Sequence, residues 1–476
     1  MPLLRHDVPT DLPQVSARLS RSSRISIGRG ERDGKKSGLE IRRHRYLGAL
    51  LLLVLFSIGR LVAERQARRD AVVQDIARSS SGEQQLTGPV LIVPYEKTVR
   101  EWRENDRGDR HLEEHQVPGQ LHLLPETFRL EGEVRTELRA RGIYQARLYH
   151  ANIRIGAEFN VPIHYGVGAD AAAYRFGQPF IAVGVSDIRG IESPLRATLN
   201  DTPLKLLPGT GTNLLQEGIH SDVATIGADG STLLRLAIEL PLLGTSEFHI
   251  TPVGRETYVA LKSNWPNPSF TGDFLPAQRT VASSGFTAQW TTSFFSTNLE
   301  EALRRCDQGA TPCEFTAHRL GVSFVDPVDQ YLKTDRAIKY ALLFISLTFA
   351  GFFLFDVLKR LPVHPIQYWL VGAALALFYL LLLSLSEHVG FGVAYLLSST
   401  ACVGLIAFYV SHVLQSAARG FGFGCGLGVL YGCLFGLLSA DDYALLMGSL
   451  LVFALVAAVM ISTRNVNWST LGSVED

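Results

Sequence analysis

One group of residues in this sequence has the types and spacing for hydrolytic chemistry: His111, Glu114 and His115, in the order H-x-x-E-H. One class of zinc peptidases uses this spacing, with both histidines on one face of a stable helix and a third ligand later in the chain. Here the motif follows the polar run 105–109 and precedes Pro118, a setting typical of an exposed hairpin tip. We therefore predict a solvated loop, and we expect no catalytic residue, no cofactor and no metal site.

Two cysteines, Cys306 and Cys313, flank a short loop that contains Gly309 and Pro312. In an oxidising compartment, two cysteines that close such a loop are most simply explained as a disulfide. A redox or metal role would require closer spacing or additional ligands. We therefore predict a disulfide between Cys306 and Cys313. The other cysteines are expected to be small apolar residues of membrane helices: Cys402, Cys425 and Cys433.

Ionisable residues also occur in or beside long apolar runs: Asp356, Glu387, His388 and His412. Such residues can form a relay or line a substrate path through a membrane. All four lie near the ends of the runs, where water is close, so placement at the membrane interface is the simpler interpretation. A transport role is the alternative.

Glycines recur at every fourth position in one apolar run: Gly420, Gly424, Gly428, Gly432 and Gly436. The Gly-rich start of the run does not match a phosphate-binding loop, because no Lys-Ser or Lys-Thr follows it. Small residues spaced by four allow helix backbones to approach closely in lipid. We predict that the five glycines form one packing face of a membrane helix.

The elements that must carry these residues are apolar runs of membrane-spanning length. Five of them follow one another closely: Ala337–Leu358, Ile366–Ser386, Phe391–Ser411, Gly420–Leu438 and Tyr443–Ser462. Each is close to the ~20 residues that a helix needs to cross the ~30 Å hydrocarbon core. A further run, Tyr46–Val62, lacks a small-residue cleavage site after it and is predicted to be an uncleaved signal anchor.

The charges between the runs predict their orientation, because short loops rich in Lys and Arg stay in the cytoplasm. With the N-terminus inside, four cations lie on the cytoplasmic side: Lys359, Arg360, Arg419 and Arg464. The opposite joints contain acidic residues and no Lys or Arg. We predict that both termini are cytoplasmic, with a disordered basic tail at 1–45 and a short tail at 463–476.

The segment 63–335 is predicted to form a β-rich periplasmic domain inserted between the first and second membrane helices. Apolar and polar residues alternate in Phe128–Leu138, Ala151–Val161 and Leu234–Leu240. This period of two indicates strands with one buried face, in an antiparallel sandwich or a long curved sheet. Three large aromatics could line a binding surface, although core packing is the simpler interpretation: Trp265, Phe270 and Phe274.

The predicted fold class is therefore a multi-pass α-helical membrane protein with six transmembrane helices, the last five forming a membrane domain at 336–462. Lys and Arg number 45 and Asp and Glu number 45, so the formal net charge is zero. No folded stretch combines a basic patch with interleaved aromatics, which argues against a nucleic-acid partner.

Several stretches, in order over residues 60–468, resemble one known family. They are Glu64–Pro94, Arg141–Tyr144, Ser186–Ile191, Gly218–His220, Ser263–Pro276, Pro327–Tyr340 and His364–His388. These stretches are similar to the CreD family of bacterial inner-membrane proteins. The resemblance implies a location in the inner membrane and a role in cell-envelope integrity, colicin tolerance and the response to β-lactam stress. It transfers no catalytic residue, and the basic tail looks like an addition to the family pattern.

Two functional hypotheses follow. In the first, the protein is a non-enzymatic envelope factor whose periplasmic domain binds an envelope component or a periplasmic or membrane protein. In the second, a transporter-like protein moves a lipid or another amphipathic molecule, although the sequence has no ATP-binding motif. The lipid bilayer is a partner in both.

Overall fold

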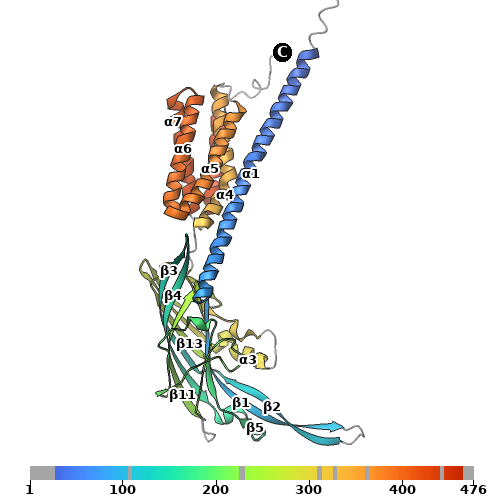
Figure 1. Cartoon of the computed structure of the whole chain (residues 1–476), viewed down its shortest axis with the longest axis vertical. Coiled ribbons are helices and arrows are strands. Elements are labelled where there is room, and N and C mark those ends of the chain that lie inside the picture. Colours follow the sequence, from blue (N-terminus) through green and yellow to red (C-terminus); the bar gives the residue numbers. More distant parts are fainter. Residues whose placement is uncertain are drawn as a thin grey trace, which may run out of the picture. The chain divides into compact units, whose positions relative to one another are not determined.

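The computed structural model describes residues 27–104, 110–224, 231–307, 313–324, 330–359, 364–439 and 444–464. The chain divides into two compact units. One combines Met1–Ala63 with Gln330–Asp476, and its described residues are helical. The other is Glu64–Asp329, and its described residues are mostly β (Figure 1).

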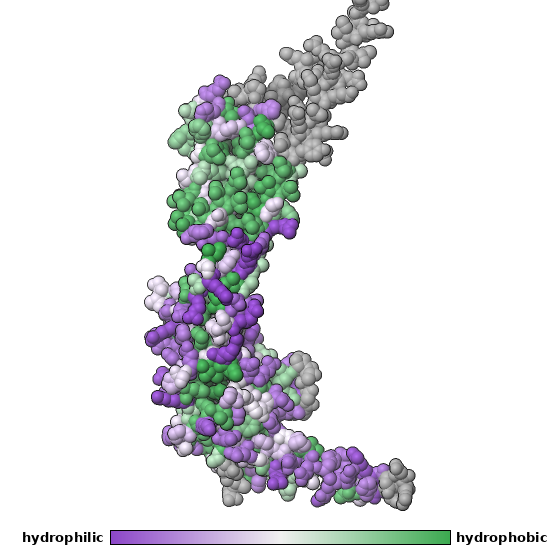
Figure 2. Space-filling model, viewed as in Figure 1, coloured by the Kyte–Doolittle hydropathy of each residue, from purple (hydrophilic) through white to green (hydrophobic). Residues whose placement is uncertain are grey.

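The helical unit is built from long apolar helices. They are α1 (Ile27–Ser79, whose last part belongs to the β unit), α4 (Gln330–Lys359), α5 (Pro365–Val389), α6 (Phe391–Val413), α7 (Ala417–Ser439) and α8 (Ala444–Thr463). Figure 2 shows a broad apolar surface over this unit, bounded at both ends by hydrophilic side chains. Apolar side chains that face outward in this number are typical of a helix bundle solvated by lipid.

Among the described residues, three helices are long and apolar enough to cross a membrane: Ile366–Val389, Phe391–Val413 and Ala417–Ser439. The other three predicted spans fall on α1, α4 and α8, and Tyr443, the first residue of the last span, lies outside the described residues. Helix α4 begins at Gln330 rather than at Ala337.

The disordered tail predicted at 1–45 is wrong for its second part, because α1 already begins at Ile27. Residues 1–26 lie outside the described residues. Once an apolar segment has formed a helix, each added residue extends it without a new nucleation cost, so polar residues before the apolar run can continue the helix.

The β unit contains two mixed sheets. In the described residues, the first (the β1 sheet) has nine strands: β14 (Ser269–Gly272), β17 (Leu320–Ser323), β12 (Glu247–Thr251), β1 (Gln84–Glu104), β6 (Phe180–Val185), β10 (Gly218–Asp222) and β9 (Leu207–Pro208) in order, with β2 (Arg110–Leu123) and β5 (Tyr174–Phe176) also paired to β1. The second (the β3 sheet) has eight: β15 (Gln278–Ala282), β16 (Gly285–Ser293), β13 (Glu256–Ser263), β3 (Thr127–Arg141), β4 (Tyr144–Val161), β11 (Thr232–Thr245), β7 (Arg196–Leu199) and β8 (Thr202–Pro203).

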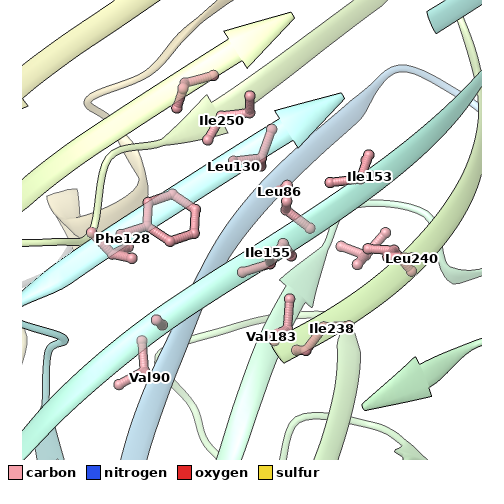
Figure 3. Packing of buried hydrophobic residues seen from close by; sticks show 14 of the residues in the cluster. Leu86, Val90, Phe128, Leu130, Ile153, Ile155, Val183, Ile238, Leu240 and Ile250 are labelled. Atoms are coloured by element: carbon pink, nitrogen blue, oxygen red, sulfur yellow. The ribbon is translucent and has the colours of Figure 1, made fainter. Parts of the chain in front are cut away.

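The inner faces of the two sheets share one hydrophobic core (Figure 3). The β1 sheet contributes Leu86, Val90, Val183 and Ile250, and the β3 sheet contributes Phe128, Leu130, Ile153, Ile155, Ile238 and Leu240. The three strands predicted from alternation are confirmed as β3, β4 and β11. The pairing is not wholly antiparallel, since β1 runs parallel to β12 and β13 runs parallel to β3.

Short helices fill the connections. They are α2 (Phe294–Thr297), α3 (Leu299–Asp307) and the single-turn 3₁₀ segments η1 (Ile163–Gly166), η2 (Ala169–Ala173), η3 (Ile188–Gly190) and η4 (Glu314–Thr316). The last turns of α1 pack on the β unit, where Ile76 is buried against Ala146 and Leu148. Arg141 and Asp75 form an ion pair beside this contact.

Candidate functional site

A hollow of about 790 Å³ lies on the solvent-facing side of the β3 sheet. The side chains that point into it come from alternate positions of the strands, because neighbouring residues of a strand point to opposite faces. The inward positions form the core, and the outward ones are mostly polar. The polar and charged lining residues are Glu131, Glu133, Asn152, Arg154, Glu192, Ser193, Glu239, Lys262, Thr287 and Gln289.

The strand register arranges the charges of this hollow in rows across the sheet. In one row, Arg154 of β4 lies between Glu131 of β3 and Glu239 of β11. A guanidinium nitrogen of Arg154 lies 3.0 Å from Glu131 Oε2. In the adjacent row, Lys262 of β13 lies opposite Glu133 of β3. Opposite charges that face each other across strands stabilise a sheet and leave a surface of alternating sign.

The rim of the hollow is formed by the segment Glu192–Pro194. The carboxylate of Glu192 lies 3.3 Å from Nδ1 of His150, and His150 does not line the hollow. The lining residues offer carboxylates, a guanidinium, an ammonium, two amides and two hydroxyls. This set suits the binding of a hydrophilic chain by hydrogen bonds and ion pairs.

The H-x-x-E-H motif lies on a strand instead of in the predicted loop. His111, Glu114 and His115 all belong to β2, which pairs with β1 in a long exposed hairpin. In a strand, residues four apart are about 13 Å apart, and Glu114 points to the face opposite the histidines. The two histidines therefore cannot share one zinc ion. In the described residues, no group of three or more His, Cys, Asp or Glu could hold a metal ion.

The cysteine pair lies at the end of α3. The sulfur atoms of Cys306 and Cys313 are bonded to each other, and residues 308–312 of the loop lie outside the described part of the chain. Beside this bond, Asp307 lies 2.8 Å from Nδ1 of His122, and Nε2 of the same ring lies 3.2 Å from the hydroxyl of Thr212. These contacts connect α3 to β2 and to the loop before β10.

The family-like aromatics are packed into the core of the β unit. Trp265 is buried, and the Arg147 guanidinium lies 3.7 Å from the centre of its ring. Phe270 meets Phe286 and Trp290 edge to face. Phe270 and Phe274 are half-buried and pack against the same hydrophobic core. The contacts of all three aromatics are therefore those of core packing.

The glycine stripe of α7 is not one packing face, and this prediction is wrong at its centre. A Cβ on Gly420 would collide with Ser411 of α6, and one on Gly424 would lie 2.8 Å from Ala407 of the same helix. Gly428 and Gly432 face open space, and Gly436 approaches Met447 of α8. Each four-residue step turns an α-helix by about 40°, so five such positions wind around the helix by about 160° and cannot all face one neighbour.

The ionisable residues of the helical unit lie near helix ends. The Tyr331 hydroxyl donates to Glu387 Oε1 at 3.1 Å, linking α4 to α5. His388 and His412 are exposed, and each ring contacts a carbonyl of its own helix. The side chain of Asp356 lies outside the described part. Deeper in the bundle, the Tyr395 hydroxyl donates to the carbonyl of Tyr431 at 2.7 Å.

A polar cluster at the end of α1 was not predicted from the sequence. The buried amide of Gln84 donates to Ser81 Oγ at 2.7 Å, to the carbonyl of Asp187 at 2.9 Å and to that of Leu243 at 3.0 Å. Arg189 binds the Asp187 carboxylate and also donates to the carbonyl of Arg78, which closes the last turn of α1. The bound guanidinium holds the pKa of Asp187 below its ordinary value.

Gly190 shows why this cluster requires its own sequence. A Cβ there would collide with the carbonyl of Leu243 and with the side chains of Gln84 and Ser81. The motif Ser186–Ile191 is therefore a joint between α1 and the two sheets. The available signal in the sequence was a Gly preceded by Asp and Arg. The residues that pack around this glycine are distant in the sequence, so the signal did not reveal them.

Comparison with known proteins identifies one family over nearly the whole chain. The family model described as "Inner membrane protein CreD" matches residues 44–469. The Inner membrane protein CreD of Escherichia coli (strain K12) is 38% identical over 439 residues, which cover 91% of this chain and 94% of that protein. The crystal structure of an M1 zinc metallopeptidase from Deinococcus radiodurans has a TM-score of 0.21 and 12% identity over 43% of each chain, too low to support any argument.

Proposed function

The chain belongs to the CreD family of inner membrane proteins, and we propose that it contributes to cell-envelope integrity by binding an envelope component through its β unit. In this proposal six helices cross the membrane, both termini are cytoplasmic and the segment 63–335 is periplasmic. Lys359, Arg360, Arg419 and Arg464 then lie on the cytoplasmic side, as the positive-inside rule requires. Colicin tolerance and survival of β-lactam stress are the expected cellular consequences.

The observation that carries the proposal is the charged hollow on the β3 sheet. Its floor is a regular sheet whose outward side chains alternate in charge. Glu239 and Lys262 are exposed on this floor, at register positions beside opposite charges. A hydrophilic glycan or peptide chain of the envelope could exchange these contacts for its own. We propose that the hollow binds its ligand without catalysis, and that its carboxylates serve as partners of Arg154 and Lys262.

The test is photocrosslinking in living cells, with a photoreactive residue at Ala260 inside the hollow. Ala237 lies on the same outward face but outside the hollow, and it provides the matched control. We expect an envelope adduct from position 260 and much less from position 237. The variant Glu239→Lys with Lys262→Glu should lose the adduct and reduce survival of envelope stress, whereas Glu158→Lys outside the hollow should not. Equal adducts at both positions would refute the hollow as the site.

The transport alternative has one observation in its favour. Hydroxyl groups are buried among α5, α6 and α7, and that of Ser398 has no hydrogen-bond partner within the described part of the chain. A polar group in lipid surroundings without a partner is costly and is often functional. Transport predicts that Ser398→Ala abolishes survival of envelope stress while the protein level is unchanged. Binding through the β unit predicts normal survival.

A further inference from the structure

The hairpin of β1 and β2 extends beyond the β1 sheet as a two-stranded ribbon. Strand β5 pairs with β1 only at residues 95–97, and beyond that point residues 98–104 pair with residues 110–116 alone. Figure 1 shows this ribbon projecting from the rest of the β unit. A two-stranded ribbon is only marginally stable by itself. Because exposed apolar residues often mark a binding surface, an ordered ribbon that carries them is suited to contact a partner.

One face of the ribbon carries an exposed apolar pair. Trp102 lies directly opposite Leu112, and the two side chains are 70% and 45% exposed. An exposed tryptophan brings a large apolar area to a contact. Tryptophan is one of the residue types enriched among the residues that contribute most to protein interfaces. Because residues two apart in a strand share a face, the neighbours of this pair on the same face are known.

Those neighbours are charged, and their signs form a checkerboard around the apolar pair. On one side Arg100 of β1 lies opposite Glu114 of β2, with Nε 2.6 Å from Oε1. On the other side the order is reversed, with Glu104 of β1 opposite Arg110 of β2 at 3.8 Å. We call these four residues together with Trp102 and Leu112 the Trp102 face.

A checkerboard of this kind is complementary to itself. If two such faces stack with the ribbons antiparallel, Trp102 meets Trp102, and Arg100 of each copy meets Glu104 of the other. If the ribbons run in the same direction, Trp102 meets Leu112, and Arg100 meets Glu114 of the other copy. In both arrangements every charge meets its opposite, so a two-fold contact satisfies the whole face.

We propose that the Trp102 face binds the same face of a second copy of this chain. The four charges sum to zero, whereas a surface made for anionic lipid would carry a surplus of cations. A contact of six residues from each copy is small for association in solution. Copies held in one membrane are at a raised effective concentration, which lets a small contact persist.

Cysteine crosslinking in native membranes tests the proposal. The full chain is used with Cys402, Cys425 and Cys433 replaced by Ala, and Trp102→Cys, Leu112→Cys or Glu101→Cys is added. Glu101 neighbours Trp102 but points to the opposite face. We expect a covalent dimer from Trp102→Cys alone, or from co-expressed Trp102→Cys and Leu112→Cys, and little from Glu101→Cys. The proposal is overturned if neither Trp102→Cys alone nor Trp102→Cys with Leu112→Cys gives a covalent dimer. It is also overturned if Glu101→Cys gives as much dimer as Trp102→Cys.

Charge exchange provides the second test. Arg100→Glu, added to the cysteine variant that gives the dimer, should reduce crosslinking. Arg103→Glu, which breaks the Arg103–Glu113 pair on the other face, should not. Co-expression of Arg100→Glu with Glu104→Arg should restore the dimer if the ribbons are antiparallel. Co-expression of Arg100→Glu with Glu114→Arg should restore it if they run in the same direction. Failure of both combinations, with all variants accumulating normally, overturns the proposal even if single variants weaken the dimer.

Discussion

The Tyr331 hydroxyl donates a hydrogen bond to Oε1 of Glu387 at 3.1 Å, joining the first turn of α4 to the last turn of α5. Lys333, also in the first turns of α4, lies 5.5 Å from the ring of Phe391 at the start of α6. Ionisable groups of α4 and α5 and an aromatic ring of α6 thus meet at helix ends, where a membrane interface offers water. Glu387 therefore has a structural partner, which reduces the need to assign it a transport role.

Tyr331→Phe should lower the unfolding temperature of the full chain in detergent, because it removes one hydrogen bond to a carboxylate, worth about 1 kcal/mol in a membrane setting. Glu387→Gln keeps an acceptor and should cost less. Both variants should survive envelope stress normally. Loss of survival in Glu387→Gln at an unchanged protein level would favour transport.

Leu substitutions in α7 should separate the two ends of the glycine stripe. Gly424→Leu should lower the yield of folded protein, because a larger side chain would collide with Ala407, an overpacking cost of about 1–3 kcal/mol. Gly428→Leu faces open space and should accumulate like the wild type. Yield and monodispersity after solubilisation measure the difference. Greater damage at position 428 would mean that an unseen neighbour covers this side of α7.

Loss of the Cys306–Cys313 bond should destabilise the β unit without unfolding it. For a loop this short, the chain-entropy model gives about 2–3 kcal/mol. Cys306→Ser with Cys313→Ser should therefore lower the unfolding temperature and increase proteolysis near α3. Thiol labelling of the unreduced wild type gives the direct check, because rapid labelling of both cysteines would rule out the bond.

The stability of the β unit should depend on pH through His249. Its ring is buried, with Nε2 3.0 Å from Thr271 Oγ1 and 3.6 Å from Glu247, and burial, aided by Arg319, lowers its pKa despite the opposing effect of Glu247. The unfolded chain then binds the proton more readily than the folded chain. The contribution of His249 is therefore constant above about pH 6.5 and is lost as the pH falls toward the folded-state pKa.

The measurement is the unfolding temperature of the full chain between about pH 7.5 and pH 5.5, compared with that of His249→Gln. Glutamine can keep a hydrogen bond to Thr271 but does not titrate. The wild type should lose more stability than the variant over this range. Parallel curves would show that His249 titrates alike in both states.

The histidines of β2 should be dispensable. His111→Ala with His115→Ala removes the only zinc-peptidase-like motif recognised in the sequence, and both side chains lie on the ribbon face opposite Trp102. The variant should survive envelope stress as the wild type does. Loss of survival with normal protein levels would return a metalloenzyme to consideration.

Periodicity in the sequence alone determined the local elements. Alternation of apolar and polar residues predicted β3, β4 and β11, and long apolar runs predicted the helices of the C-terminal part. Both signals depend on which side of each element is buried, and neighbours in the chain are enough to reveal this. The charged hollow was not predictable, because Arg154 gains its position between Glu131 and Glu239 only when β3, β4 and β11 pair in one register.

The glycines of α7 and the joint at Gly190 show in two ways that a sequence pattern does not predict contacts between distant segments. Spacing by four indicated a helix face, but the direction of that face depends on where α6 and α8 lie, so only Gly420 and Gly424 meet α6. Gly190 is required because Leu243 and Gln84, distant in the chain, converge on it. Local pattern determines an element, whereas contacts between distant segments depend on packing of the whole fold, and only the tertiary structure decides them.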